Sequence, residues 1–448
     1  MNPSLLHCTY RLLLVSAWLV SAQAATAQTI RYVTPTGTSA PASATNSWAT
    51  STTDLQGAIN ASAPGDQVWL KAGLYLPTMT TGPASRTVSF SMKNGVTLYG
   101  NFTGTETALT ERTLTYPLST TLSGDIGTPG SIADNSYHVI SNPQGLTATA
   151  VLDGVLITAG NANGSFPDYD GGGMYNYAFR GVCSPTVRNC AFAGNSASSN
   201  VGAVYNYSNQ ASSYNGITAP TFTNCIFLTN SAGSGGGAAA SFGDNSQLML
   251  INCSFGGNTA GYGGALYNPA NTRTALINCI LFGNGAGAIS NTGNGTAVAG
   301  YSLFGASVGG YSGVSNLTTT TSPFVLATGN LQLTTCSLAI NAGDPATATI
   351  AVGTTDLGGN VRVVGRRIDM GAFEMQSGPG VFPVTVADGP WNTGAVWFCE
   401  RVPMVSDAVQ MLHVVSLPDS YVGGAGQVTF GTGGTLRYGT ASRFVLGQ

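Results

Sequence analysis

Six ionisable side chains between positions 125 and 170 have types that suit acid–base chemistry or cation binding. They are Asp125, Asp134, His138, Asp153, Asp168 and Asp170. Two carboxylates on either side of a bond can act as general acid and general base, and several carboxylates together can hold Ca²⁺. Asp168 and Asp170, in the stretch NGSFPDYDGGG, are the calcium candidates, although Asp, Asn and Gly are also good turn residues.

Structural roles compete with chemistry at the other ionisable positions. Asp153 aligns with a repeated asparagine, which favours a bend. His138 lies in the apolar stretch YHVIS, where a hydrogen-bonded structural histidine is expected. Far downstream, three aspartates are expected to set turns and end caps: Asp344, Asp356 and Asp369.

The long stretch 171–335 is almost free of ionisable residues. It contains one acid, Asp244, and no histidine, lysine or glutamate; its arginines are Arg180, Arg188 and Arg273. A wall of this composition cannot position both an acid and a base. We therefore predict neither a catalytic residue nor a metal ligand within it.

The same stretch contains a repeat built on asparagine, cysteine and phenylalanine. The repeated cysteines are Cys190, Cys225, Cys253 and Cys279, spaced by 35, 28 and 26 residues. An asparagine precedes each one: Asn189, Asn224, Asn252 and Asn278. Two positions later come Phe192, Phe227, Phe255 and Leu281, and five positions later Asn195, Asn230, Asn258 and Asn284. A period of this size is typical of a solenoid.

Within each unit, short alternating apolar runs are broken by Gly and Asn, which predicts strands and bends rather than helices. Strands that recur at this period predict a parallel β-helix with identical positions stacked in columns, clearest over 151–310. We expect the phenylalanines to fill the interior. We expect Asn224, Asn252 and Asn278 to lie at bends, with side chains turned inward and bonded to one another.

The repeated cysteines are expected to be buried thiols that act as small apolar groups. Stacked positions have parallel Cβ vectors, which suit a disulfide poorly. Cys183 and Cys190 lie seven residues apart at a chain reversal, and a disulfide between them stays an alternative. Metal binding is not expected, since no histidine lies near these cysteines.

A short helix is predicted ahead of the coils, in the stretch TTDLQGAINASAPGD. Thr53 or Asp54 can cap its first turn, and Leu55, Ala58 and Ile59 fall on one face. Such a helix would cover an end of the solenoid, whose unpaired strand edges otherwise invite association.

Composition and the first residues indicate export. Only 7% of the 448 residues are charged and the net charge is −3, which disfavours nucleic-acid binding and electrostatic attraction to membranes. Residues 1–27 have the features of a signal peptide: Arg11, the apolar run LLLVSAWLV and the cleavage site Ala25-Thr26-Ala27. No later segment is apolar for long enough to span a membrane. We expect a secreted or outer-surface protein.

The blocks NCxFxxNxA and GGAxYN resemble repeats of right-handed parallel β-helix proteins, a superfamily that includes pectate lyases and polygalacturonases. Residues 336–374 (CSLAINAGD…DLGGN…DMGAFE) are similar to the closing segment of the choice-of-anchor Q domain, although Asn341 stands where that family more often has Asp. That domain occurs in exported bacterial surface proteins of mostly undefined function. The resemblance implies an all-β fold: a right-handed parallel β-helix solenoid with a short N-terminal capping helix.

A small C-terminal β-rich module is expected as well. It resembles a module of large secreted proteins from Bacteroidetes-type bacteria, on the motif WFCERVP at 397–403, with Glu400 where glycine is common. The predicted divisions are a signal peptide 1–27, a β-helix domain 28–375, a linker 376–384 and the module 385–448.

The enzymes of this superfamily suggest two reactions. Glycoside hydrolysis needs two carboxylates facing the bond, and β-elimination needs a base and usually a cation. The carboxylate and arginine signatures of lyases and polygalacturonases are not recognisable here. A divergent lyase or hydrolase that uses the upstream acidic cluster is therefore the alternative hypothesis.

Tyr177 and Tyr207 are the candidate carbohydrate-binding residues. They occupy matching places in MYNYAF and VYNYSN, two residues after Tyr175 and Tyr205. On adjacent coils their rings would form an aromatic platform for a sugar face, or simply pack against a loop. We predict an exported scaffold without enzymatic machinery, for adhesion or glycan contact. The expected partner is a polysaccharide or cell-surface glycan, and Ca²⁺ is the one cofactor considered.

Overall fold

The computed structural model describes most of the chain outside its first 27 residues. The predicted signal peptide lies outside the described residues. These are 28–36, 47–78, 85–208, 216–244, 246–285, 287–347, 352–365, 367–377, 382–400, 402–403, 405 and 407–446.

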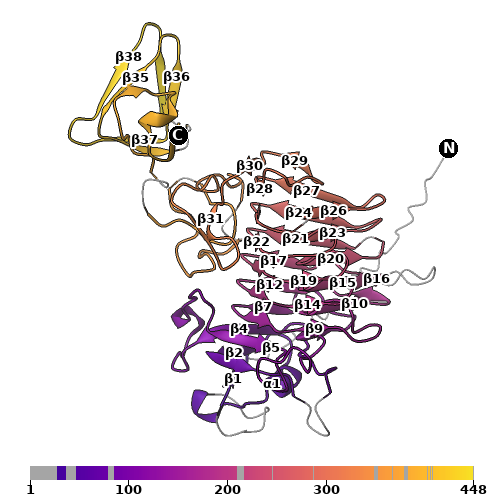
Figure 1. Ribbon diagram of the computed structural model, residues 1–448. Coiled ribbons are helices and arrows are strands. Elements are labelled where there is room, and N and C mark those ends of the chain that lie inside the picture. Colours follow the sequence, from indigo (N-terminus) through magenta and orange to yellow (C-terminus); the bar gives the residue numbers. More distant parts are fainter. Residues whose placement is uncertain are drawn as a thin grey trace, which may run out of the picture.

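Three long sheets form the stack in Figure 1, and every strand pair in them is parallel. The first sheet contains, in order, β1 (Ile30–Val33), β2 (Gln67–Lys71), β4 (Thr97–Phe102), β7 (Val151–Asp153), β12 (Thr186–Arg188), β17 (Thr221–Thr223), β21 (Gln247–Ile251), β24 (Arg273–Ile277), β27 (Thr296–Gly300) and β29 (Ser312–Val314). The second contains β3 (Gly73–Tyr75), β5 (Thr120–Ser123), β8 (Leu156–Thr158), β13 (Ala191–Ala193), β18 (Ile226–Leu228), β22 (Ser254–Gly256), β25 (Ile280–Leu281), β28 (Leu303–Gly305) and β30 (Leu317–Thr319). The third contains β6 (Ile140–Asn142), β10 (Met174–Ala178), β15 (Val204–Ser208), β20 (Ala239–Phe242), β23 (Leu266–Asn268) and β26 (Ile289–Asn291).

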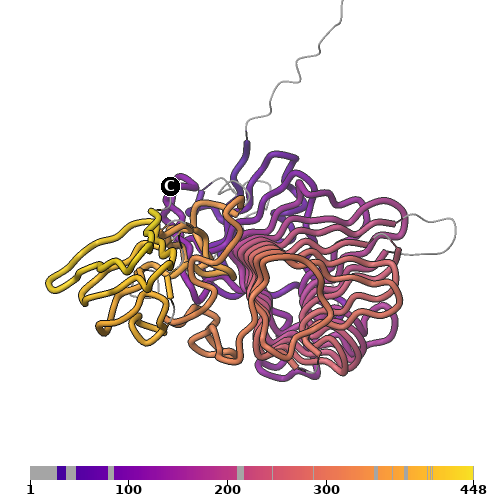
Figure 2. Tube along the Cα trace, turned by 90° about the horizontal axis from the view of Figure 1, so that it is seen from above, coloured from indigo at the N-terminus to yellow at the C-terminus, as the bar shows by residue number. Residues whose placement is uncertain are grey.

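Smaller elements complete the coils. They are β9 (Asn161–Ala162), β14 (Ser196–Ala197), β19 (Ser231–Ala232), β11 (Gly181–Val182), β16 (Gly216–Ile217), the antiparallel hairpin β31 (Phe324–Leu326) and β32 (Asn330–Leu333), and the 3₁₀ turns η2 (Trp48–Thr50) and η3 (Leu109–Glu111). Because each coil lies directly on the one before it, the chain climbs as a closed tube, which Figure 2 shows from above. The predicted right-handed parallel β-helix is confirmed.

Helix α1 (Leu55–Ala61) lies at the N-terminal end of the stack, as predicted (Figure 1). The Asp54 carboxylate accepts a hydrogen bond from the Gly57 amide at 2.8 Å and caps the first turn. Leu55, Ala58 and Ile59 are buried in the main core. At the other end, Tyr311 stacks on Phe304 with ring centroids 3.9 Å apart.

The predicted phenylalanine column is confirmed. Phe192 pairs with Phe227, Phe227 with Phe255 and Phe255 with Leu281, one per coil, and all four side chains are fully buried. The first two ring pairs are nearly parallel, with centroids 5.3 and 4.6 Å apart. The tube is therefore filled by one continuous apolar column rather than by separate small cores.

The repeated cysteines are buried free thiols, as expected. Cys183 and Cys190 are also free, so the alternative disulfide between them is not formed. Each thiol of the column donates to a backbone carbonyl of the coil below; for example, Sγ of Cys253 lies 3.5 Å from the Phe222 oxygen. Burial raises the pKa of the Cys190 and Cys183 thiols to about 12.

The asparagine that precedes each cysteine matches the prediction in part. Asn224, Asn252 and Asn278 have φ between 50° and 54°, a left-handed bend that asparagine tolerates well. Their side chains point outward, not inward. Asn224 donates to the Val352 carbonyl at 2.6 Å and Asn252 to the Asp369 carbonyl at 3.0 Å. The predicted bends are confirmed, and neighbouring side chains of the column do bond one another: Asn224 donates to Asn189 and Asn278 to Asn252, each at 3.3 Å. The predicted inward direction was wrong, because the closing segment covers these bends.

The inward ladder exists one bend further along each coil. Nδ2 of Asn195 donates to Oδ1 of Asn230 at 3.0 Å, Asn230 to Asn258 at 2.9 Å, and Asn258 to Asn284 at 2.8 Å. Each of these amides also bonds the backbone of the preceding coil, as Asn230 does at the Phe192 carbonyl. The ladder satisfies buried groups that the bend leaves without strand partners.

The closing segment 336–374 lies along the side of the stack, between the first and second sheets, and does not cover its end (Figures 1 and 2). The role of end cap was therefore wrong for its aspartates. That of turn setter is confirmed for Asp344 and Asp356, whereas Asp369 joins two distant parts of the segment. Asp344 accepts from the Ala346 amide, Asp356 from Asn360 and Asp369 from Asn341.

The C-terminal module contains β33 (Gly389–Pro390), β34 (Ala408–Met411), β35 (Val414–Leu417), β36 (Val422–Ala425), β37 (Gln427–Phe430), β38 (Thr435–Tyr438), β39 (Arg443–Leu446) and the turns η4 (Gly394–Val396) and η5 (Phe398–Glu400). β34 pairs with β37, β35 with β38 and β36 with β39, all parallel, so the module is a second, two-coil solenoid. The Cys336–Cys399 disulfide, which the sequence did not suggest, ties it to the closing segment.

Replacing Phe227 by Ala should destabilise the stack by roughly 3–5 kcal/mol, because it opens a cavity in the middle of the column. Thermal unfolding of the variant measures the loss. The control Val325→Ala changes a residue that is 59% exposed. It should unfold at the same temperature as the parent protein. A Phe227→Ala protein as stable as that control would refute the buried column.

The five buried thiols should resist labelling. Their raised pKa values leave almost no thiolate at pH 8, and the packed coils exclude reagents. A chain from Gln28 onward treated with a thiol-disulfide reagent should show no reactive thiol when folded and five in denaturant. Fast labelling of the folded protein would contradict the structure.

Candidate functional site

Aromatic side chains cover the outside of the third sheet. In β10 the alternate residues Tyr175 and Tyr177 point outward, because Met174, Asn176 and Ala178 fill the interior. Strand β15 repeats this arrangement one coil higher, with Tyr175 paired to Tyr205 and Tyr177 to Tyr207.

The tyrosine pairs are offset stacks. The rings of Tyr175 and Tyr205 have centroids 5.3 Å apart, and those of Tyr177 and Tyr207 5.9 Å apart with planes inclined by 15°. Tyr175 and Tyr205 are buried, and burial raises the pKa of both phenols. Tyr177 and Tyr207 keep part of their surface in solvent. The inner pair, Tyr175 and Tyr205, therefore packs beneath a loop. The outer pair, Tyr177 and Tyr207, is accessible to solvent.

The aromatic surface continues up the stack further than the sequence suggested. Phe242 pairs with Tyr207 on the next coil and lies 4.9 Å from the Tyr205 ring. Tyr267 follows one coil higher, 5.6 Å from Phe242. The sequence did not predict this continuation. In the unit GGGAAAS, which ends just before Phe242, Ala240 stands where the other units have tyrosine.

A pocket of about 400 Å³ opens at the lower end of this surface. Ser141 of β6 pairs with Tyr175, which places Pro143 under Tyr177. No aromatic ring of the described residues continues the outer column at that position. The pocket is lined by Ser141, Asn142, Pro143, Phe166, Pro167, Tyr175 and Tyr177.

The acidic residues nearest to this pocket, Asp168 and Asp170, fix the position of the loop 163–171 beside it. Asp170 accepts from the Asn200 amide at 2.6 Å, and burial raises the pKa of its carboxyl. Nε2 of His138 lies 3.4 Å from Asp168, and its other ring nitrogen lies 2.9 Å from the Gly171 carbonyl. The predicted structural role of His138 is confirmed, and both aspartates anchor segment 163–171.

Asp125 and Asp134 set a turn on another loop. Oδ2 of Asp125 accepts from the Gly130 amide at 2.8 Å, and Oδ2 of Asp134 from the Thr128 amide at 2.7 Å. Such bonds to backbone amides lower the pKa of Asp134. Both carboxylates therefore serve local backbone geometry.

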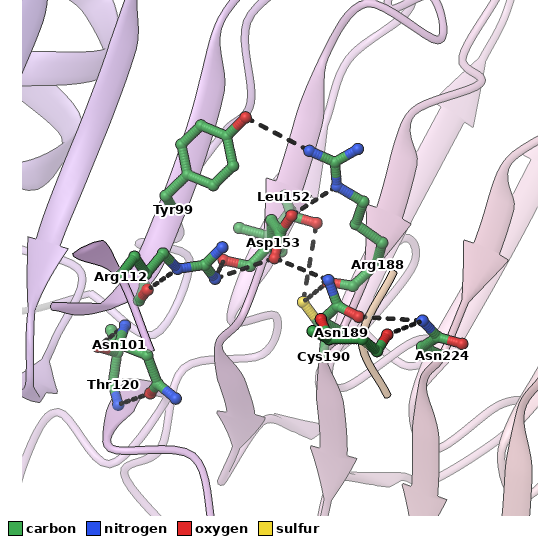
Figure 3. Close-up of polar contacts among 12 residues, drawn as sticks. Tyr99, Asn101, Arg112, Thr120, Leu152, Asp153, Arg188, Asn189, Cys190 and Asn224 are labelled. Carbon is green, nitrogen blue, oxygen red and sulfur yellow. Dashed lines mark hydrogen bonds and ion pairs between the residues drawn. The ribbon is translucent and has the colours of Figure 1, made fainter. Parts of the chain in front are cut away.

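Asp153 lies on the outside of the first sheet and is held by two arginines (Figure 3). Arg112 donates to Oδ1 at 2.9 Å, Arg188 to Oδ2 at 2.5 Å, and Asn189 to Oδ1 at 3.0 Å. The alignment of Asp153 with the repeated asparagine was wrong by one residue: Asp153 pairs with Arg188, and Gly154, with φ 77°, takes the bend. Each carboxylate oxygen already accepts a hydrogen bond from an arginine, so Asp153 serves the ion cluster.

This ion cluster borders a cleft of about 550 Å³ between the first sheet and the closing segment. Tyr99 accepts a hydrogen bond from Arg188 at 3.3 Å, and the Arg112 guanidinium lies 5.1 Å from the Tyr99 ring centre. Burial would lower the pKa of Arg188, but Asp153 and Tyr99 raise it above its usual value. Arg112 and Tyr99 have no repeat signature, so the sequence alone could not bring them to Asp153.

The described residues contain no group of three or more His, Cys, Asp or Glu side chains placed to hold a metal ion. The acidic residues of the predicted cluster do not lie together. Asp125 belongs to a turn, Asp170 to a loop anchor and Asp153 to an ion cluster. Among the described helices, none has the length and apolar character needed to cross a membrane.

Comparison with known proteins finds distant structural likenesses. No protein-family model matches the sequence, and no curated protein matches it. The pectate lyase Pel9A is similar with a TM-score of 0.42 and 16% identity, over 78% of this chain and 96% of that one. A polygalacturonase from Erwinia carotovora ssp. carotovora has a TM-score of 0.21 and 11% identity, over 65% of this chain and 95% of that one. Likenesses this distant transfer neither residues nor activity.

Removing the Asp153 carboxylate should destabilise the first sheet. Asp153→Ala leaves the buried Arg112 without its counter-ion, at a cost of roughly 3–5 kcal/mol. Arg188→Ala should cost less, because the Arg188 side chain is 43% exposed. Thermal unfolding of both variants shows which one loses more stability. Equal stability of Asp153→Ala and the parent would show that the ion cluster does not stabilise the fold.

Proposed function

We propose that this protein is an exported β-helix scaffold that contacts glycans through the aromatic surface of its third sheet. The observation that supports this most is the coil-by-coil continuation of Tyr177, Tyr207 and Phe242 beside a pocket of about 400 Å³. Aromatic rings with one side packed and the other in solvent are suited to the apolar faces of sugar rings.

The rigidity of the coils adds to this argument. Tyr177 and Tyr207 come from adjacent paired strands, so their spacing is fixed by backbone hydrogen bonds before any ligand arrives. A ligand that contacts both rings pays little for ordering the protein. A glycan chain could extend across several coils and meet a ring on each.

Export is the second part of the proposal. The N-terminal stretch has signal-peptide features, and the Cys336–Cys399 disulfide fits an oxidising compartment. The low charge and the absence of a described membrane-spanning helix agree with a secreted or surface-attached protein.

A lyase or hydrolase built on the upstream acids is the weaker candidate. Such chemistry needs carboxylates that face one bond. Asp125 and Asp134 serve a turn, Asp153 binds two arginines, and Asp168 and Asp170 anchor a loop. No observation brings them to a common groove.

Replacing Tyr177 and Tyr207 together by Ala should weaken glycan binding. Loss of two stacking rings should cost about 1–3 kcal/mol, or roughly 5- to 150-fold in Kd. A glycan array identifies a binder, and isothermal titration then compares the variant with the parent. The matched control, Phe430→Ala with Tyr438→Ala, removes two exposed rings of the C-terminal module and should leave Kd unchanged. Equal loss in both double variants would refute the site.

Incubation with pectin, alginate or other acidic polysaccharides should give no turnover, with or without calcium. The coils over 171–335 provide no positioned acid and base, which would otherwise contribute about 10²–10⁴-fold. New reducing ends and absorbing unsaturated products are the two readouts. Turnover that Asp168→Ala or Asp170→Ala abolishes would overturn the scaffold proposal.

A further inference from the structure

The cleft of about 550 Å³ beside the Asp153 ion cluster has three walls, which come from distant parts of the chain. One wall is the outer face of β7, β12, β17 and β21, four neighbouring strands of the first sheet. Residues 352–355 of the closing segment form the second wall, and residues 112–114, which follow β4, form the third. Four parallel strands at about 4.8 Å spacing span roughly 14 Å, so the cleft is elongated across the coils.

The lining of this cleft carries one surplus positive charge. Among the described residues that line it, Arg112 and Arg188 are cations and Asp153 is the one carboxylate. Asp153 pairs with both arginines and neutralises one of them. The protein as a whole has a net charge of −3, so the cleft differs in sign from the rest of the molecule. A partly enclosed surplus of one sign concentrates ions of the opposite sign, which here are anions.

The Arg188 guanidinium is held in place with one terminal nitrogen to spare (Figure 3). Its Nε donates to Asp153 at 2.5 Å and its Nη2 to the Tyr99 hydroxyl at 3.3 Å. Within the described chain, Nη1 of Arg188 has no hydrogen-bond partner, and the side chain is 43% exposed. Two N–H groups therefore point away from the ion cluster on a guanidinium whose orientation is already fixed. Such a group loses little freedom when it binds an oxyanion.

Threonine hydroxyls extend the polar lining away from this arginine. Thr221 and Thr223 of β17 line the cleft one coil above Arg188, which pairs with Thr223. Neither hydroxyl has a partner among the described residues. The opposite wall is held by Asn224, whose side chain donates to the Val352 and Thr355 carbonyls. A ligand with its own hydroxyl groups would thus meet hydrogen-bonding groups along the cleft.

We propose that this cleft is a second binding site, for a small ligand that carries a carboxylate or sulfate group. The oxyanion accepts charge-assisted hydrogen bonds from Nη1 of Arg188, and Arg112 adds its positive charge beside it. The threonine hydroxyls contact polar groups on the body of the ligand. This site lies on the first sheet, whereas Tyr177 and Tyr207 lie on the third, so it does not depend on the proposed glycan contact.

Isothermal titration of the chain from Gln28 to Gln448 tests this proposal, with sodium sulfate, glucuronate and the uncharged glucose as probes at constant ionic strength. We expect saturable binding of an anionic probe. Binding of sulfate alone or of glucuronate alone identifies the oxyanion. Arg188→Gln should weaken this binding at least about 10-fold, because the charge-assisted hydrogen bonds are lost. Asp153 keeps Arg112 as its counter-ion in this variant, which should therefore fold.

The matched control, Arg273→Gln, removes an exposed arginine of β24 in the same sheet but outside the lining, and should leave Kd unchanged. Arg188→Lys retains the charge without the planar guanidinium and should bind more weakly than the parent but more tightly than Arg188→Gln. Tyr177→Ala with Tyr207→Ala should not affect the anionic probe, which separates this site from the aromatic surface.

Three results would overturn the proposal. The first is the lack of saturable binding by both sulfate and glucuronate. The second is binding that Arg188→Gln leaves unchanged, because the anion would then lie elsewhere. The third is an equal loss in Arg188→Gln and Arg273→Gln, which would indicate a general effect of net charge and not a site.

Discussion

Parallel pairing between successive coils is the constraint on which the rest of this molecule depends. Each strand of the three long sheets bonds the equivalent strand of the next coil, so a residue in one coil lies directly over its counterpart. Every choice of side chain is therefore made for a column and not for a single position. A phenylalanine at 227 requires an apolar residue at 192 and at 255, and the repeat in the sequence is the record of that requirement.

The same constraint explains how a surface of low charge can acquire a function. Interior columns must be apolar or must satisfy their own hydrogen bonds, as the chain of amides from Asn195 to Asn284 does. Exterior columns face fewer restrictions. On the third sheet they collect Tyr177, Tyr207 and Phe242 at spacings that the backbone sets. An extended aromatic surface arises with no more than one suitable residue per coil.

The closing segment and the C-terminal module are attached to the tube by contacts outside the repeat. The closing segment binds the outward asparagines of the left-handed bends, where Asn224 and Asn252 donate to its carbonyls. Asp356 fixes one of its turns, and Asp369 ties its two halves together through the Asn341 amide. Beyond it, the disulfide between Cys336 and Cys399 attaches a smaller solenoid of two coils.

The sequence alone determined the class of fold, the phenylalanine column, the buried thiols and helix α1, since these depend on periodic or local signals. It also placed Tyr177 and Tyr207 on adjacent coils. Tertiary structure decided the rest. Asp153 bonds Arg112, 41 residues away, and Asn252 bonds Asp369, 117 residues away. No repeat in the sequence predicts either contact. Both contacts depend on how irregular segments fold back onto the tube. A repeat fixes which residues stack within it, but the path of a segment outside the repeat is set by packing, which no spacing in the sequence records.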